Sequence, residues 1–115
     1  MQKNIFGKRC EIIAMNFLKK KGYKILETNY KNTIGEIDII AKDNDYIVFV
    51  EVKGRMSKKF GDPVEAVDYR KQFKIRNVAT MYLKQKHLLD TNCRFDVISV
   101  LGDSEEEIRH IEKAF

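Results

Sequence analysis

The chain has 115 residues, which is enough for one domain with a modest hydrophobic core and too few for a second domain. Hydrophobic residues make up 43% of it and charged residues 34%, a balance that is typical of globular proteins and excludes a disordered or fibrous chain. The 22 basic and 17 acidic residues give a net charge of +5, which favours a polyanionic partner but does not require one.

Targeting and redox features of the sequence point to the cytoplasm. The N-terminus leads into an amphipathic pattern without the apolar core of a signal peptide, and no run approaches the about 18 apolar residues that cross a bilayer. Cys10 and Cys93 lie far apart, without a CxxC pair or a histidine at zinc-binding spacing. We therefore expect a cytoplasmic protein with reduced cysteines and no membrane segment.

The N-terminal segment is expected to form a helix from about Asn4 to Lys21. Apolar residues recur along it at steps of four, three and four, at Phe6, Cys10, Ile13 and Phe17. Such spacing places them in one stripe on a helix surface. Asn4 is a suitable N-cap residue, and Gly22 stands where a left-handed residue commonly ends a helix.

Three strands are expected to follow this helix. Residues 23–30 alternate loosely as a strand, and a loop at 31–35 separates them from two strongly apolar, β-branched runs at 36–42 and 46–53. The connection between these two runs, at 43–45, is short. A connection of this length predicts that they pair as an antiparallel hairpin.

A long helix is expected after the polar and basic loop at 54–61. Asp62, Pro63 and Glu65 supply an N-cap, a proline at the first helical position and a glutamate three residues after the cap. The helix is expected to continue to about Lys86, with an inner face formed by Ile75, Val78, Ala79, Tyr82 and Leu83. Because polar residues interrupt the apolar stripe before Ile75, a break near Asp68 is the alternative to one continuous helix.

The last expected elements are a strand at 93–101 and a short edge strand at 108–111. The element order is then α-β-β-β-α-β. A helix that connects two strands of one sheet makes those strands parallel, while the hairpin is antiparallel. The predicted fold is therefore of the α/β class, with a mixed sheet flanked by helices.

Acidic and basic side chains interrupt the two apolar runs of the hairpin. Asp38 and Glu51 lie on neighbouring strands, and strand alternation places Lys53 on the same face as Glu51. Two carboxylates supply hard oxygen ligands that suit Mg²⁺ or Mn²⁺, and the backbone carbonyl of Val52 is a further candidate ligand. Lys53 is placed to activate water or to stabilise charge on a phosphate. Its apolar surroundings are expected to lower its pKa, and the nearby acids to oppose that shift.

Glu11 is a candidate site residue from outside the hairpin. It lies at the margin of the apolar stripe of the first helix, one turn after Gly7. A glycine costs a helix about 1 kcal/mol relative to alanine, so Gly7 calls for a reason. Close approach of a ligand or of another backbone is one reason, and its place at the helix N-terminus is the other.

A structural explanation of the hairpin charges stands beside the functional one. A buried Glu–Lys pair is near break-even against hydrophobic replacements, so a purely structural ion pair brings little stability. The strand ends could instead emerge into solvent, which would make Asp38, Glu51 and Lys53 ordinary surface charges.

Three sequence runs together resemble a known protein family. They are GEIDIIAKDNDYIVFVEVKGR at 35–55, FGDPVEAV at 60–67 and RFDVISV at 94–100. Over nearly its whole length the chain resembles the YraN-like family of small bacterial proteins. That family is placed in the PD-(D/E)XK superfamily with a restriction-endonuclease-like fold, close to archaeal Holliday-junction resolvases. The resemblance implies the same α-β-β-β-α-β core that the element order predicts.

The resemblance also implies roles for individual residues. Asp38 matches the motif aspartate, Glu51 the (D/E) and Lys53 the lysine. Glu11 matches the helical acid of the resolvase-like branch. Ile37 stands where the motif has proline, a variation that leaves the carboxylate of Asp38 intact.

Basic residues cluster after Lys53 and at the start of the long helix. The set expected to contact a phosphate backbone comprises Arg55, Lys58, Lys59, Lys71 and Lys74, with Phe60 available for stacking. Such contacts would position DNA without reading its bases. The alternative is a basic surface that is merely solvated.

Three further polar residues carry little or no functional signal in the sequence. Gln72 resembles a helical glutamine used by some branches of the superfamily, with a solvated helix residue as the alternative. His87 and His110 are isolated in the sequence, and we expect neither to take part in function.

The leading hypothesis is a Mg²⁺- or Mn²⁺-dependent endonuclease that hydrolyses phosphodiester bonds of DNA, with branched or structured DNA as a candidate substrate. A non-catalytic nucleic-acid-binding module that retains the nuclease fold is the alternative. A protein-interaction subunit with merely structural acids is a third reading. Resolvase-like relatives commonly pair, so a homodimer is one expectation for the assembly.

Overall fold

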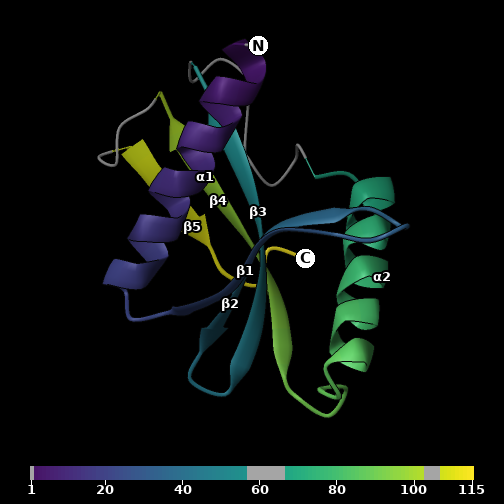
Figure 1. The fold of residues 1–115 in the computed structure, drawn as a ribbon. Coiled ribbons are helices and arrows are strands. Elements are labelled where there is room, and N and C mark those ends of the chain that lie inside the picture. The colour runs from purple at the N-terminus through teal and green to yellow at the C-terminus, as the bar shows by residue number, and fades with distance from the viewer. Residues whose placement is uncertain (1, 57–66, 103–106) are drawn as a thin grey trace.

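The computed structural model describes residues 2–56, 67–102 and 107–115 (Figure 1). In these ranges the elements are α1 (Gln2–Lys20), β1 (Lys24–Lys31), β2 (Glu36–Asp43), β3 (Tyr46–Arg55), α2 (Tyr69–Gln85), β4 (Cys93–Leu101) and β5 (Ile108–Ile111). This order confirms the predicted α-β-β-β-α-β succession, with β5 as the added edge strand.

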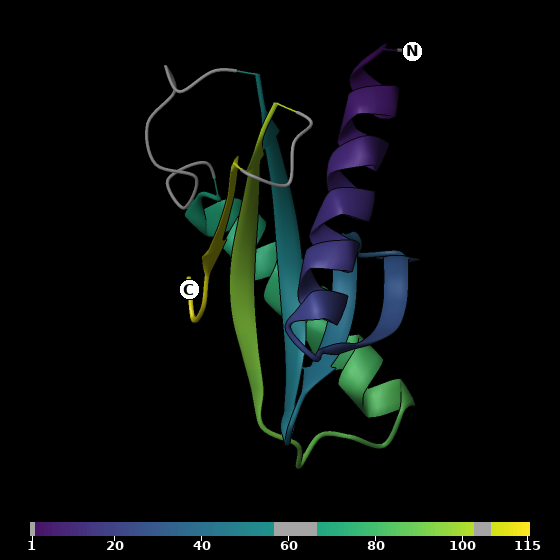
Figure 2. The ribbon, with the colours of Figure 1, turned by 90° about the vertical axis from the view of Figure 1, so that its left-hand side faces the viewer.

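The described strands form one mixed sheet in the order β1-β2-β3-β4-β5. β3 and β4 are parallel, because α2 carries the chain back between them, and the other neighbouring pairs are antiparallel. The two helices cover opposite faces of this sheet (Figure 2). The α/β class is therefore confirmed, and the arrangement is compatible with a restriction-endonuclease-like core.

Each face of the sheet has its own hydrophobic core. Under α1, Ala14 and Leu18 pack with residues of β2, β3 and β4 that include Ile39, Val50 and Ile98. Under α2, the five apolar residues predicted for its inner face are all buried: Ile75, Val78, Ala79, Tyr82 and Leu83. Both faces of the central strand β3 are therefore apolar, which explains why its sequence reads as a continuous hydrophobic run.

The predicted C-terminal end of α1 is confirmed, and its predicted N-terminal end is not. Gly22 has φ +93°, so the prediction of a left-handed residue after the helix is confirmed. The prediction that Asn4 caps the helix is wrong, because α1 already begins at Gln2 and Asn4 lies within it. Apolar packing further along α1 does not determine where its first turn starts, and a short polar residue there fits a cap and a helix interior alike.

The described helix α2 does not run through Asp68, so the predicted uninterrupted helix across this residue is not formed. Asp68 is extended, with φ −72° and ψ 173°, and its side chain accepts a hydrogen bond of 2.9 Å from the Lys71 N–H. Asp68 is therefore the N-cap of α2. The start signal predicted at Asp62, Pro63 and Glu65 lies outside the described residues.

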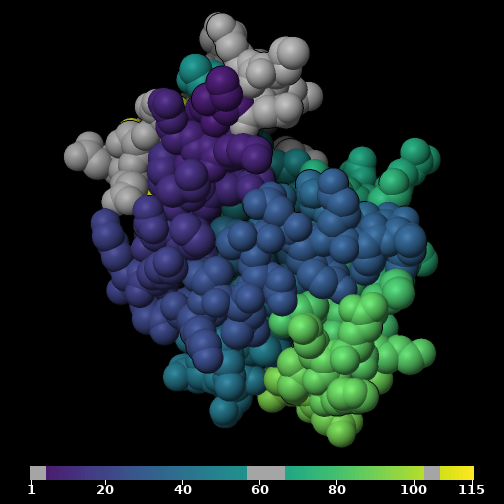
Figure 3. Space-filling view, viewed as in Figure 1, coloured from purple at the N-terminus to yellow at the C-terminus, as the bar shows by residue number. Residues whose placement is uncertain are grey.

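The first helix and the two strands that follow it, β1 and β2, form one side of the molecule. In the space-filling view, α1 and the residues of β1 and β2 form most of the visible surface (Figure 3).

No helix in the described ranges is both long and apolar enough to span a bilayer. Cys10 is buried and Cys93 is half-buried, and the two thiols are not joined as a disulfide.

The close packing of α1 on β3 yields a stability prediction. A Cβ atom at Gly54 would lie 2.7 Å from Cys10 Sγ and 2.9 Å from Phe6 Cε2, whereas one at Gly7 would meet nothing within 4 Å. We expect Gly54→Ala to lower the free energy of unfolding by about 1–3 kcal/mol. Gly7→Ala should instead raise it by up to about 1 kcal/mol. Urea denaturation of both variants checks this, and an unchanged midpoint for Gly54→Ala would contradict the packing of α1 on β3.

Candidate metal centre

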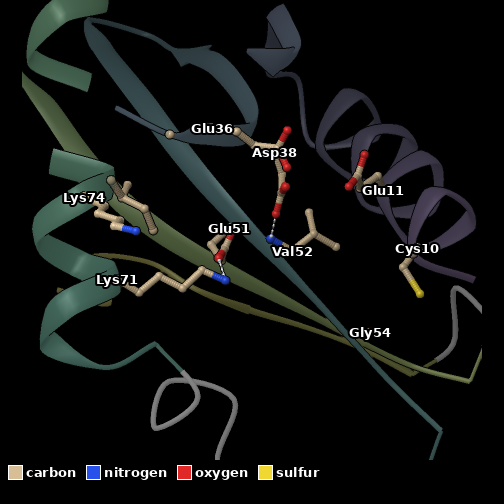
Figure 4. A pocket seen from close by; sticks show the side chains of 12 residues that line it. Cys10, Glu11, Glu36, Asp38, Glu51, Val52, Gly54, Lys71 and Lys74 are labelled. Carbon is tan, nitrogen blue, oxygen red and sulfur yellow. Dashed lines mark hydrogen bonds and ion pairs between the residues drawn. The ribbon is translucent and has the colours of Figure 1, made fainter. Parts of the chain in front are cut away.

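A cleft of about 360 Å³ opens where four elements meet (Figure 4). α1 contributes Glu11, β2 contributes Asp38, β3 contributes Glu51, and α2 contributes Lys71 and Lys74. Residues that are distant in the sequence therefore converge on one concave surface. Gly7 also lines this cleft, and a Cβ there would meet no atom within 4 Å, so no other backbone approaches this glycine closely.

Asp38 lies where β2 separates from β3. The paired residues of these strands extend from Asp43 and Tyr46 at the turn to Ile39 and Val50. Beyond that pair, Oδ2 of Asp38 accepts a hydrogen bond of 2.8 Å from the backbone N–H of Val52. The carboxylate thus satisfies a donor that a partner strand would otherwise satisfy, and the diverging strands open the cleft.

Glu51 is buried, with 6% of its surface exposed, and it lies between two lysines. Its Oε2 is 2.5 Å from the Lys71 ammonium and 3.9 Å from the Lys53 ammonium. Lys53 therefore lies on the same face of β3 as Glu51, as strand alternation predicts. Lys71 reaches the same oxygen from the opposing helix.

The two carboxyl groups of the cleft interact directly, and their protonation is shared. Burial, a hydrogen bond with Glu51 and the charge of Glu51 raise the pKa of Asp38 to about 9. Burial also disfavours ionisation of Glu51, but hydrogen bonds from Asp38 and Lys71 outweigh it and hold its pKa below the ordinary value. At neutral pH the cation-free pair therefore carries one proton, on Asp38.

The two lysines respond to this environment in opposite ways. Burial and the adjacent Lys71 ammonium lower the pKa of Lys53, against the charges of Glu51 and Asp38. For Lys71 the burial effect is outweighed by its contact with Glu51, and its pKa is raised. Lys53 therefore gives up its proton more readily than Lys71 does, and of the two opposing effects expected from the sequence, burial outweighs the nearby acids.

Glu11 approaches the pair from α1 and is held by an unusual residue. Burial raises the pKa of Glu11, while a hydrogen bond with the Asn29 side chain opposes that shift. Asn29 lies on β1 between the residues paired with Ile37 and Ile39, and it has φ +52°. A left-handed residue inside a strand is uncommon outside glycine and is typical of functional sites. The sequence analysis did not single out Asn29, whose partner Glu11 lies on another element.

The family model for the uncharacterised protein family UPF0102 matches residues 10–100. The chain belongs to UPF0102. UPF0102 proteins from Alkaliphilus oremlandii, Clostridioides difficile and Clostridium acetobutylicum are 52%, 50% and 49% identical to it. The matches cover 100%, 99% and 95% of this chain, and 100%, 96% and 92% of the three relatives. The YraN-like family resemblance is thus confirmed. Because UPF0102 is described as uncharacterised, membership by itself assigns no activity.

The basic residues predicted as phosphate contacts are distributed unevenly in this UPF0102 chain. Lys71 and Lys74 line the cleft, whereas Arg55, at the end of β3, is not among the lining residues. Lys58 and Lys59 lie outside the described residues, as does Phe60. The sequence indicated that Lys71 and Lys74 share a helix face, three residues apart, but not that this face meets Glu51.

Of the remaining polar residues, Gln72 and His110 have structural partners and His87 is exposed. Nε2 of Gln72 donates a 2.8 Å hydrogen bond to the Val67 carbonyl, which holds the segment before α2 rather than reaching the cleft. His110 lies 2.8 Å from Asp96 Oδ2, within a buried polar network. His87 follows α2 with φ +59° and is exposed.

The donor set of this UPF0102 site fits a hard divalent cation with few protein ligands. In the described ranges, no three His, Cys, Asp or Glu side chains gather as a ligand set. Asp38 and Glu51 form a hydrogen-bonded carboxyl pair, and the buried Oε2 of Glu51 accepts no hydrogen bond beyond its ion pairs. Mg²⁺ is commonly held by one or two carboxylates, with waters and substrate phosphates completing its shell. Two carboxylates and a backbone carbonyl suit that cation better than zinc or copper.

Proposed function

We propose that this chain is a metal-dependent endonuclease that hydrolyses phosphodiester bonds of DNA. The observation that carries the proposal is the buried Asp38–Glu51 pair, which lines the cleft and has the Lys53 ammonium 3.9 Å from Glu51. Charged side chains are rarely buried without a partner, and this arrangement combines paired acids with a lysine whose pKa is lowered. Perturbed acids and bases in one cleft are typical of catalytic sites.

Each residue of the centre has a role in this proposal. Asp38, Glu51 and the Val52 carbonyl would hold Mg²⁺ or Mn²⁺, which when bound supplies a Lewis acid for the phosphate. Lys53 accepts a proton from the attacking water, because its burial favours the neutral form. Glu11 lines the cleft from α1 and orients that water, with its own carboxyl held by Asn29.

The cationic side chains around the cleft support a nucleic-acid substrate. Lys71 and Lys74 of α2 line the cleft, and Arg55, Lys58 and Lys59 are proposed to extend the contact with the phosphate backbone. Contacts with phosphates bind DNA without reading its base sequence. Branched or otherwise structured DNA is therefore a candidate substrate. A homodimer would supply two centres for cutting both strands of a symmetrical junction.

A non-catalytic nucleic-acid-binding module is the second candidate. It is favoured by the contact of Lys71 with Glu51, because an ammonium already neutralises the carboxylate that a cation would need. This module would bind DNA in a salt-dependent way and would not cleave it.

Cleavage assays separate the two candidates. We expect the purified protein to cut linear, nicked or four-way DNA in Mg²⁺ or Mn²⁺ and not in a chelator. Lys53→Ala should reduce the rate by about 10²-fold or more, since general acid–base groups contribute that much. Lys84→Ala, on the exposed end of α2, is the matched control and should cut at the wild-type rate. Salt-dependent binding without turnover would reject the nuclease in favour of the binding module.

A further inference from the structure

We propose that Lys71 is a positioning residue that holds Glu51 in the cation-free protein and exchanges with the divalent cation when it binds. The inference rests on the proposed function for its metal centre, and it adds a control on how that centre is loaded. It starts from the 2.5 Å contact between the Lys71 ammonium and Oε2 of Glu51, which is drawn in Figure 4.

The ammonium and a cation cannot use this oxygen together. The Glu51 side chain is 7% exposed, so its Oε2 has little free space around it. A cation bound at the usual 2.0–2.1 Å of Mg²⁺ would lie against the Lys71 ammonium at its present position. Two positive centres at that separation repel strongly in a partly buried site, where solvent screening is weak. Binding therefore requires Lys71 to move.

The charges of the centre are matched to such an exchange. In the cation-free protein the Glu51 carboxylate is neutralised by the Lys71 ammonium. A divalent cation held by Glu51 and Asp38 would take over that neutralisation from the ammonium. The released Lys71 would then be available for an anionic substrate at the mouth of the cleft.

The ammonium group of Lys71 is free to move, whereas its backbone is held in place. Its backbone N–H is held by the Asp68 carboxylate at 2.9 Å, so the Cα position is set by the helix cap. Its side chain is 44% exposed, so the ammonium can swing toward solvent along its flexible stem. Lys74, one turn further along α2, lines the same cleft and is not in ion-pair contact with Glu51. The exchange would therefore leave the fold of α2 unchanged.

Mn²⁺ titration without DNA tests the exchange directly. We expect Lys71→Met to bind Mn²⁺ about tenfold more tightly than the wild type, because a charge-assisted contact no longer competes for Glu51. Lys74→Met removes the same charge from the same cleft without breaking that contact. Its affinity should rise by less than about threefold, as expected for a screened charge nearby. Lys71→Arg, which restores a cation, should return the affinity to the wild-type value or below.

The outcomes separate this inference from the proposed function. If the wild type binds Mn²⁺ and Lys71→Met binds it equally or less tightly, the exchange is overturned while the metal centre stands. An equal gain in Lys71→Met and Lys74→Met also overturns it, because the effect would be general electrostatics. If neither the wild type nor any variant binds Mn²⁺, the metal centre and the exchange both fail. Circular dichroism verifies the fold of each variant, and Lys71→Gln replaces Lys71→Met should the latter not fold.

Discussion

Asp38→Asn is expected to abolish Mn²⁺ binding and DNA cleavage while leaving the protein at least as stable as the wild type. Asparagine keeps an oxygen that can accept the Val52 N–H, but it carries no charge for a cation. Folding raises the pKa of Asp38 from 3.8 to about 9, mainly through burial. The carboxyl is therefore neutral in the cation-free protein at pH 7, and the protein loses stability as pH rises from the lower value to the higher. Asparagine does not ionise, so Asp38→Asn does not lose this stability as pH rises.

Calorimetric titration and thermal denaturation check this prediction. Wild-type binding of Mn²⁺ at pH 7 should release about one proton, seen as a dependence of the heat on the buffer. The apparent affinity should rise by up to about tenfold per pH unit until Asp38 titrates near its pKa of about 9. Asp45→Asn, in the exposed turn between β2 and β3, is the matched control. Wild-type Mn²⁺ affinity in Asp38→Asn would show that this carboxylate is not a ligand.

Asp96→Ala is expected to lower the free energy of unfolding by about 1.5–3 kcal/mol, because it removes the fully buried partner of Arg94 and leaves that guanidinium with the more exposed carboxylates of Asp43 and Glu112. Asp96 is fully buried and accepts hydrogen bonds of 3.1–3.2 Å from Arg94, together with 3.1 Å from the Lys113 N–H. His110 lies 2.8 Å from the same carboxylate. Asp96 is not among the residues that line the cleft, so Mn²⁺ affinity should not change in the folded fraction.

The same carboxylate predicts how stability depends on pH. Burial disfavours ionisation of Asp96, but hydrogen bonds from His110, Arg94 and Lys113 outweigh it and hold its pKa below 3.8. A pKa depressed by folding contributes stability above the unfolded value, and that stability is lost as pH falls through the folded value. Urea denaturation should therefore show a steeper loss below about pH 4 for the wild type than for Asp96→Asn. Parallel losses in the two proteins would contradict this role.

Local patterns in the sequence were sufficient for most of the fold. The strand at 93–101 was predicted with the observed bounds, because its apolar run and its ends are local signals. The hairpin of β2 and β3 followed from the short turn between them. The start of α2 was harder, since the sequence has an N-cap signal at Asp62 and only a break in the apolar stripe near Asp68. Asp68 caps the described helix, and the earlier signal lies outside the described residues.

The part of the candidate site that lies on β2 and β3 could also be predicted, because it depends on residues that are close in the sequence. Glu51 and Lys53 are two residues apart on one strand, so alternation alone places them on one face. Asp38 joins them because the hairpin brings its strand beside theirs. The role of Gly7 was left open by the pattern, and the structure shows that Gly54 is the glycine where α1 packs closely.

What the sequence determined by itself is the set of elements, their apolar faces and the acids and lysine that interrupt the central hairpin. These depend on periodicity and on neighbours a few residues away. Tertiary structure alone decided that Lys71 contacts Glu51, that Asn29 contacts Glu11, and that the Arg94–Asp96 pair, which alternation already places on one face of β4, is buried. Each of the first two joins elements that are distant in the chain, and the third depends on burial by a helix and an edge strand. The physical reason is that periodicity specifies which side of an element is polar, whereas the partner of a polar group depends on how whole elements pack.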